Sequence, residues 1–204
     1  MGLWETIVSG SYVMVLLGLF SVGALVLIIK LFLVLKSERS ALEGLSGELR
    51  GLVSSGEYRG ALGACGDCPC YLTRIVSKGI EQAGKPYIIV KEAFEGAGAR
   101  ETMLLRRDTV YLNTIGVLSP MLGLLGTVLG MMDAFNVIAF HEGMGSPEML
   151  AVGIAKALVT TAAGLIIAIP AMGFSYYFRT GIQRLSAQAQ ELASELVPYI
   201  SKQI

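Results

Sequence analysis

The chain alternates between long apolar runs and stretches rich in polar and charged residues. Residues 12–29 form an unbroken apolar run, and residues 31–35 extend it beyond Lys30. A second run has its charge-free centre at 115–132, and a third extends from about residue 149 to residue 178. Because a helix needs about 20 apolar residues to cross the hydrocarbon core of a bilayer, the pattern predicts transmembrane helices at 11–35, 109–140 and 148–179.

The polar stretch at 36–108 differs in kind from the apolar runs. Its glycines, capping residues and apolar spacing predict short helices at 43–50, 57–64, 71–83 and 90–108, with a turn at 65–70. We expect a small helical domain with little core of its own, which packs against neighbouring copies and against extensions of the membrane helices. Residues 180–204 read as a polar helical tail. The predicted fold is therefore all-α, with long helical extensions outside the membrane.

The distribution of basic residues predicts the orientation. Eleven of the 16 Lys and Arg residues lie in 36–108, and none lies in 1–10 or in the turn at 141–147. The positive-inside rule then places 36–108 and the tail in the cytoplasm, and both other segments on the opposite, periplasmic side. Residues 1–10 lack a basic n-region and the first apolar run is too long for an h-region, so we expect no cleavable signal.

Composition excludes several classes of function. Hydrophobic residues make up 53% of the chain, which is typical of a membrane protein. The net charge is +0 and no basic stripe is interleaved with aromatic residues, so nucleic-acid binding is not expected. The sequence has no glycine loop for phosphate, no nucleophile–base pair and no His-Glu-x-x-His motif. We expect no enzyme activity and no cofactor.

The second and third apolar runs contain glycines and prolines at positions that bear on helix packing and helix shape. Residues 119–135 read SPMLGLLGTVLGMMDAF and include Gly123, Gly126 and Gly130. A glycine costs a soluble helix about 1 kcal/mol relative to alanine, whereas in a bilayer it lets helices approach closely. We expect these glycines, with Gly164, to pack helices and to join copies of the chain. Pro120 and Pro170 are expected to kink their helices.

Thr127 and Thr161 are hydroxyls within apolar surroundings. The second helix runs outward and the third returns, which places both threonines roughly 20 Å below the outer ends of their helices at 1.5 Å per residue. On one interpretation each hydroxyl bonds the backbone of its own helix. On the other, several copies assemble these hydroxyls into a polar ring along an ion path. Thr160 is a weaker candidate.

Two charges lie toward the outer ends of the same helices. Asp133 either caps the wet end of its helix or takes part in function, and Lys156 either reaches the headgroups or marks a functional position. Counting residues places the two charges at nearly one level, so we expect an ion pair between them near the outer mouth of a pore. At about 100° per residue, neither need share the face of the threonines.

The cysteines and the histidine offer a weaker site. Cys65, Cys68 and Cys70 have spacings that suit zinc, but no histidine lies nearby and His141 is predicted on the other side of the membrane. We therefore expect a structural turn at 65–70, a solvated His141 and no metal site.

Two long motifs resemble one family. The pattern PxxGLxGTVxGM from Pro120 to Met131 is similar to the second transmembrane helix of ExbB and TolQ proteins, which are proton-channel subunits distantly similar to the MotA stator. Residues 153–171, which read GIAKALVTTAAGLIIAIPA, resemble the third helix. Residues 55–108 are similar more loosely. Lys156 departs from the family, because its ExbB members usually have a glutamate there.

The resemblance implies a homopentamer in the bacterial inner membrane with its N-terminus in the periplasm. Thr127 and Thr161 match the two transmembrane threonines that face a partner's carboxylate. That partner is an ExbD- or TolR-like protein with one aspartate-bearing span, and a TonB- or TolA-like protein carries the motion to an outer-membrane task. Two alternatives stay open at this point: a MotA-like stator, whose family has four spans, and a scaffold that conducts nothing.

Overall fold

The computed structural model describes the backbone of residues 12–140 and 147–201, and the side chains of residues 12–136 and 150–201. The predicted N-terminal segment 1–10 lies outside the described residues. So does nearly all of the predicted turn at 141–147, including His141.

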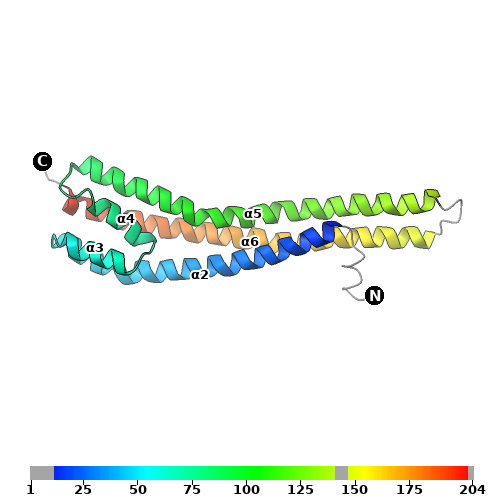
Figure 1. Cartoon of the computed structure of the whole chain (residues 1–204), viewed down its shortest axis with the longest axis horizontal. Coiled ribbons are helices and arrows are strands. Elements are labelled where there is room, and N and C mark those ends of the chain that lie inside the picture. Colours follow the sequence, from blue (N-terminus) through cyan, green and yellow to red (C-terminus); the bar gives the residue numbers. More distant parts are fainter. Residues whose placement is uncertain (1–11, 141–146, 202–204) are drawn as a thin grey trace. The chain divides into compact units, whose positions relative to one another are not determined.

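The described chain is helical throughout its regular elements, as Figure 1 shows. Its helices are α2 (Tyr12–Ser54), α3 (Tyr58–Asp67), α4 (Tyr71–Ile80), α5 (Tyr87–Phe140) and α6 (Pro147–Ile200). Three of them, α2, α5 and α6, are long and apolar enough to cross a membrane. The all-α prediction and the three apolar helices are confirmed, and the chain is a multi-pass membrane protein.

The predicted breaks between short helices are partly wrong. No separate helix begins at residue 43, because α2 continues from the first apolar run to Ser54. Its glycines weaken the helix locally, but Leu42, Leu49 and Val53 are buried at helical spacing and hold this part against its neighbours. The predicted helix at 90–108 is likewise the first part of α5, and the tail is the last part of α6.

The residues form two compact units, and the division falls within α2, α5 and α6. Unit 1 comprises residues 1–29 and 110–176, and unit 2 comprises 30–109 and 177–204. Unit 1 buries Leu17, Ala24 and Leu112, but many large apolar side chains on its three helices stay exposed, Ile166 at 71% and Ile169 at 70% among them. Apolar surface of this extent requires lipid or other protein against it.

Unit 2 has a core to which five described helices contribute, α3 through Ala61 and Cys65. The largest fully buried side chains include Leu49 of α2, Tyr71 and Ile75 of α4, and Leu196 and Ile200 of α6, while Phe94 of α5 is 3% exposed. A Cβ added at Gly79 would lie 2.2 Å from the Phe94 ring, so this glycine allows α4 to approach α5 closely. In unit 2, α4 therefore shares its core with parts of α2, α5 and α6; the expected contact with neighbouring copies stays a prediction.

Ionic and polar contacts fix the helices of unit 2. Arg74 of α4 pairs with Glu101 of α5 at 2.6 Å and with Glu38 of α2 at 3.5 Å. Glu38 also accepts a hydrogen bond of 2.7 Å from the backbone N–H of Tyr71. Lys30 pairs with Asp108 at 2.6 Å. The two glutamates and Asp108 are 13–17% exposed, so these pairs are partly shielded from water.

Candidate functional site

A seam of small residues joins α5 to α6 within unit 1. A Cβ added at Gly123 would lie 2.9 Å from the Thr160 carbonyl oxygen and 2.9 Å from Thr161 Cα. One added at Gly126 would lie 2.5 Å from Thr160 Oγ1, and one at Gly130 would lie 2.9 Å from Ala157 Cβ. Side chains larger than hydrogen therefore do not fit at these positions, and the two backbones come close together.

The seam continues in both directions. Gly164 of α6 faces Ser119, whose carbonyl oxygen would lie 2.5 Å from an added Cβ. Gly116 faces Met172 in the same way, and Gly153 faces Ala134. The residues of α5 in the seam recur every three or four positions from Gly116 to Ala134, the spacing at which antiparallel helices interdigitate.

The four glycines singled out from the sequence thus pack two helices of the same chain. This corrects the expectation that Gly126 and Gly130 join copies, because their surface is already covered by α6. Residues of the seam that sequence reasoning missed are Gly116, Ser119, Ala134, Gly153 and Ala157. Their spacing of three and four residues is the signal that would have found them.

The seam places Thr127 and Thr161 at one level. Gly126, which precedes Thr127, faces Thr160, which precedes Thr161. Thr127 is 8% exposed, and its hydroxyl donates to the Leu124 carbonyl at 2.7 Å. Thr161 is half-buried and donates at 3.0 Å to the Gly123 carbonyl on the other helix. Thr127 therefore bonds its own helix, whereas Thr161 bonds across the seam.

Thr160, the weaker candidate from the sequence, takes part in the contact between α5 and α6. It is 6% exposed, and its hydroxyl lies 2.7 Å from the Ala157 carbonyl and 3.2 Å from the Gly123 carbonyl. The Gly123 carbonyl is thus contacted by the hydroxyls of both Thr160 and Thr161. The two donors fix the spacing and register of α5 against α6 at the level of Thr127.

Asp133 and Lys156 lie toward the end of the seam formed by Ala134 and Gly153, and both are exposed. Among the residues with described side chains, no ion pair joins Asp133 to Lys156 or to any other group. The expected contact between adjacent helices is therefore not formed within one chain. At about 100° per residue, Asp133 lies about 120° around α5 from Thr127, and Lys156 about 140° around α6 from Thr161.

The two prolines lie within long helices, and Cys70 lies at the start of α4. Helix α5 continues through Pro120 and α6 through Pro170, so neither proline ends its helix, and the kinks there stay predictions. Cys70 caps α4: its backbone N–H donates to Thr73 Oγ1 at 2.9 Å, and its sulfur takes part in a capping box with the same residue. The turn predicted at 65–70 corresponds to the end of α3 and the start of α4.

Cys65 is a buried thiol in the same region. Burial raises the pKa of the Cys65 thiol from 9.0 to about 11, and the neighbouring Cys70 adds to the rise. A thiol with a raised pKa stays protonated at neutral pH, whereas metal ligation requires the thiolate. No group of three or more His, Cys, Asp and Glu side chains is placed to hold a metal ion among the described residues.

Three apolar helices, a close α5–α6 seam and hydroxyls at one level of it define a class of helical multi-pass membrane protein. A family model confirms and narrows this class. Residues 71–191, more than half of the chain, match the MotA/TolQ/ExbB proton channel family. The chain belongs to this family.

Curated relatives agree with the family. The chain is 46% identical over 85 residues to biopolymer transport protein exbB1 of Vibrio cholerae, a match that covers 42% of this chain and 34% of that protein. It is 36% identical over 105 residues to a putative ExbB-like biopolymer transport protein of Synechocystis, covering 51% and 50%. It is 40% identical over 90 residues to the Tol-Pal system protein TolQ of Haemophilus influenzae, covering 43% and 39%. The chain spans between a third and a half of the length of these relatives.

Proposed function

We propose that this chain is the proton-channel subunit of a bacterial inner-membrane motor driven by the proton motive force. In this proposal the motor energises outer-membrane transport or envelope maintenance through a TonB- or TolA-like protein. Family membership gives the class of energy-transducing membrane subunit. The observation that carries the proposal further is the pair of hydroxyls at one level of a closely packed helical hairpin, Thr127 and Thr161.

The geometry supports a role for these hydroxyls at a polar path rather than in packing alone. A threonine hydroxyl that donates to a carbonyl still has acceptor capacity for a further hydrogen bond. Thr161 is half-buried in the single chain, so it stays accessible beside the seam. Assembled copies would bring such hydroxyls into a ring, and we propose a homopentamer with α5 and α6 around the central path.

The titrating acid is proposed to belong to a partner. In unit 1, the segments with described side chains are 12–29, 110–136 and 150–176, and Asp133 is the one carboxylate in them. It lies six residues beyond Thr127, about 9 Å along the helix. A carboxylate is the group that takes up and releases protons within a membrane path. We therefore propose an ExbD- or TolR-like partner, present as a dimer, whose single span carries an aspartate to the level of the threonines.

The orientation follows from the basic residues of unit 2. The positive-inside rule places residues 36–108 and 180–204 in the cytoplasm, and the N-terminus and the 141–147 turn in the periplasm. Part of unit 2 is then the cytoplasmic portion of the three long helices with α3 and α4 packed on them. A packed helical extension of this kind suits a stationary subunit around a moving partner.

Purification of the complex from its own host tests the proposal. The chain is tagged at its C-terminus, extracted in mild detergent, and analysed by native mass spectrometry. The expected species contains a pentamer of the chain and a dimer of a one-span protein with an aspartate in its apolar helix. A homo-oligomer that never co-purifies with such a protein under any extraction condition contradicts the motor and favours a scaffold.

A further inference from the structure

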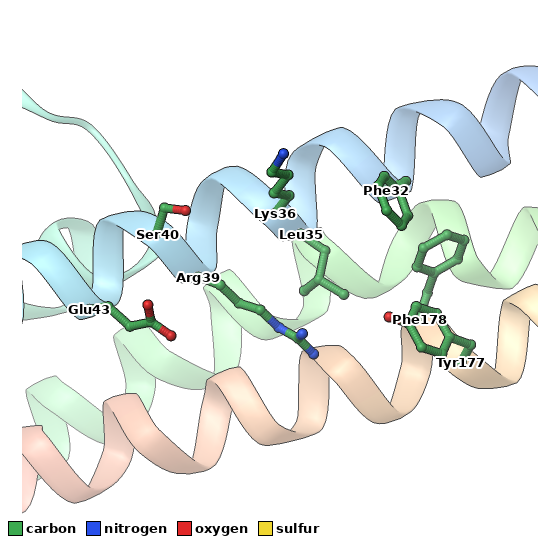
Figure 2. Close-up of a pocket in the computed structure, with 8 residues that line it drawn as sticks. All are labelled: Phe32, Leu35, Lys36, Arg39, Ser40, Glu43, Tyr177 and Phe178. Carbon is green, nitrogen blue, oxygen red and sulfur yellow. The ribbon is translucent and has the colours of Figure 1, made fainter.

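A pocket of about 240 Å³ lies between α2 and α6, entirely within unit 2. Figure 2 shows the eight residues around it. They come from one face of α2 and from the end of the apolar part of α6: Phe32, Leu35, Lys36, Arg39, Ser40, Glu43, Tyr177 and Phe178. The α2 residues recur every three or four positions, so they form one stripe on that helix.

The pocket lies where the apolar part of each helix gives way to polar sequence. On α2 the apolar run ends at Leu35, and on α6 it ends at Phe178 and is followed by Arg179. Phe32 is 53% exposed and Tyr177 is 52% exposed, whereas Phe178 is fully buried and meets Tyr177 edge to face at a ring separation of 5.5 Å. Exposed aromatic rings at such a boundary are typical of the headgroup region of a bilayer.

The charges at the pocket have no side-chain partners among residues 12–136 and 150–201. Arg39 is half-buried, and Figure 2 shows its guanidinium reaching from α2 toward α6. Among the described side chains, none forms an ion pair or hydrogen bond with Arg39, Lys36 or the carboxylate of Glu43. Arg39 and Glu43 are separated by one helical turn, a spacing at which such pairs commonly form, yet here both charges stay available.

We propose that this pocket binds the headgroup of a membrane phospholipid that carries both a phosphate and a primary amine. The planar guanidinium of Arg39 binds the phosphate. Lys36, whose ammonium group extends away from α6 in Figure 2, adds positive charge to this part of α2. Glu43 accepts the ammonium group one helical turn further from the bilayer. The acyl chains lie beside Phe32 and Tyr177 on the apolar side. Basic pockets between membrane helices are known to take lipid headgroups.

Charge complementarity favours an amine-bearing headgroup over those of phosphatidylglycerol and phosphatidylcholine. Two cations and one carboxylate match a headgroup with an anionic phosphate and a cationic amine more fully than one with phosphate and neutral hydroxyls. A choline headgroup has no N–H to donate to Glu43. The site therefore predicts an order of affinity, with phosphatidylethanolamine bound more tightly than phosphatidylglycerol or phosphatidylcholine.

Native mass spectrometry of the purified full-length chain, titrated with each of the three lipids, tests the proposal. We expect Arg39→Gln to weaken phosphatidylethanolamine binding about fivefold, as removal of one basic residue near a membrane surface does. The control is Arg184→Gln, which removes an exposed arginine of α6 that does not line the pocket. This control should bind lipid like the wild type. Equal lipid binding by Arg39→Gln and Arg184→Gln would overturn the site.

Two further arms test the identity of the occupant. Glu43→Gln should abolish the preference for phosphatidylethanolamine over phosphatidylglycerol, and retention of that preference would overturn the role of Glu43. Inorganic phosphate at the concentration of the lipid should not displace it, since the acyl chains add to binding, and displacement would show a site for free phosphate instead. Dissociation of the oligomer by Arg39→Gln would show that the pocket contacts a second copy and contradict lipid as its occupant.

Discussion

At the scale of single residues, the most informative side chains are the threonine hydroxyls of the apolar helices and the cysteine thiols. Thr127 and Thr161 could be singled out from the sequence because hydroxyls are rare in the charge-free runs, and counting residues placed them at one depth. Counting could not show that Thr161 donates to Gly123 on the other helix, because that contact depends on how closely the helices approach. Nor could it show that Lys30 pairs with Asp108.

The reactivity of Cys65 is one prediction at this scale. Because its pKa is raised to about 11, the thiolate that reacts with maleimides is scarce at pH 7.5. The pKa of the Cys68 thiol is also raised by burial, so the difference between the two thiols lies in their access to the reagent. We expect N-ethylmaleimide to modify half-exposed Cys68 at least tenfold faster than buried Cys65, in single-cysteine variants followed by mass spectrometry. Equal rates would contradict the burial of Cys65.

The raised pKa of Cys65 also affects stability. Because folding disfavours the thiolate, the stability contributed by Cys65 is lost as pH rises from about 9 to 11.

The cap of α4 gives a second residue-scale prediction. Thr73 is 1% exposed, and its hydroxyl accepts the Cys70 N–H and lies 2.8 Å from the Cys68 carbonyl. Thr73→Val keeps the shape and removes these bonds, which should destabilise unit 2 by about 1–2 kcal/mol. The measurement is a thermal melt in detergent followed by circular dichroism. Ser77→Ala, whose exposed hydroxyl bonds only its own helix, serves as the control and should melt like the wild type.

At the scale of elements, the main feature is the close packing of α5 against α6 along the seam. The glycines of the second helix could be recognised from the sequence as a packing face, but their partner could not be assigned. Spacing alone does not distinguish a neighbouring helix of the same chain from a helix of another copy. The helix boundaries show the converse problem: glycines suggested breaks near residues 43–50, whereas the burial of Leu42, Leu49 and Val53 keeps α2 continuous to Ser54.

A glycine substitution measures the seam directly. A Cβ at Gly164 meets the Ser119 carbonyl oxygen at 2.5 Å, a backbone atom that cannot rotate away, so Gly164→Ala should destabilise the chain by about 1–3 kcal/mol. Gly173 lies on the same helix with nothing within 4 Å of an added Cβ. Gly173→Ala should therefore be neutral or slightly stabilising. Denaturation in mixed detergent micelles compares the two variants, and a Gly164→Ala variant as stable as Gly173→Ala would contradict the seam.

At the scale of the whole molecule, the exposed apolar surface of unit 1 and the exposed charges on its helices indicate contacts beyond a single chain. Asp133 and Lys156 lie at similar levels, away from the face of the threonines, and do not pair within the chain. We therefore propose that Asp133 of one copy pairs with Lys156 of a neighbouring copy in the oligomer. Such pairing offsets part of the cost of holding a charge near apolar surroundings.

A charge exchange tests that contact between copies. We expect Asp133→Lys and Lys156→Asp each to reduce the yield of intact oligomer in native mass spectrometry, because each places like charges together. The double exchange should restore most of the oligomer. A double exchange no better than either single variant would show that Lys156 reaches the headgroups independently of Asp133.

The central claim is that protons cross the membrane by the level of Thr127 and Thr161. The complex purified from its host is reconstituted into vesicles that contain a pH-sensitive dye, and proton uptake is measured under an imposed membrane potential. The control is Thr114→Val, which removes an exposed hydroxyl that bonds its own helix backbone on α5. We predict wild-type uptake for Thr114→Val and a loss of at least about tenfold for the double variant Thr127→Val with Thr161→Val, with both oligomers intact. Wild-type proton uptake by an intact Thr127→Val, Thr161→Val oligomer would contradict the account.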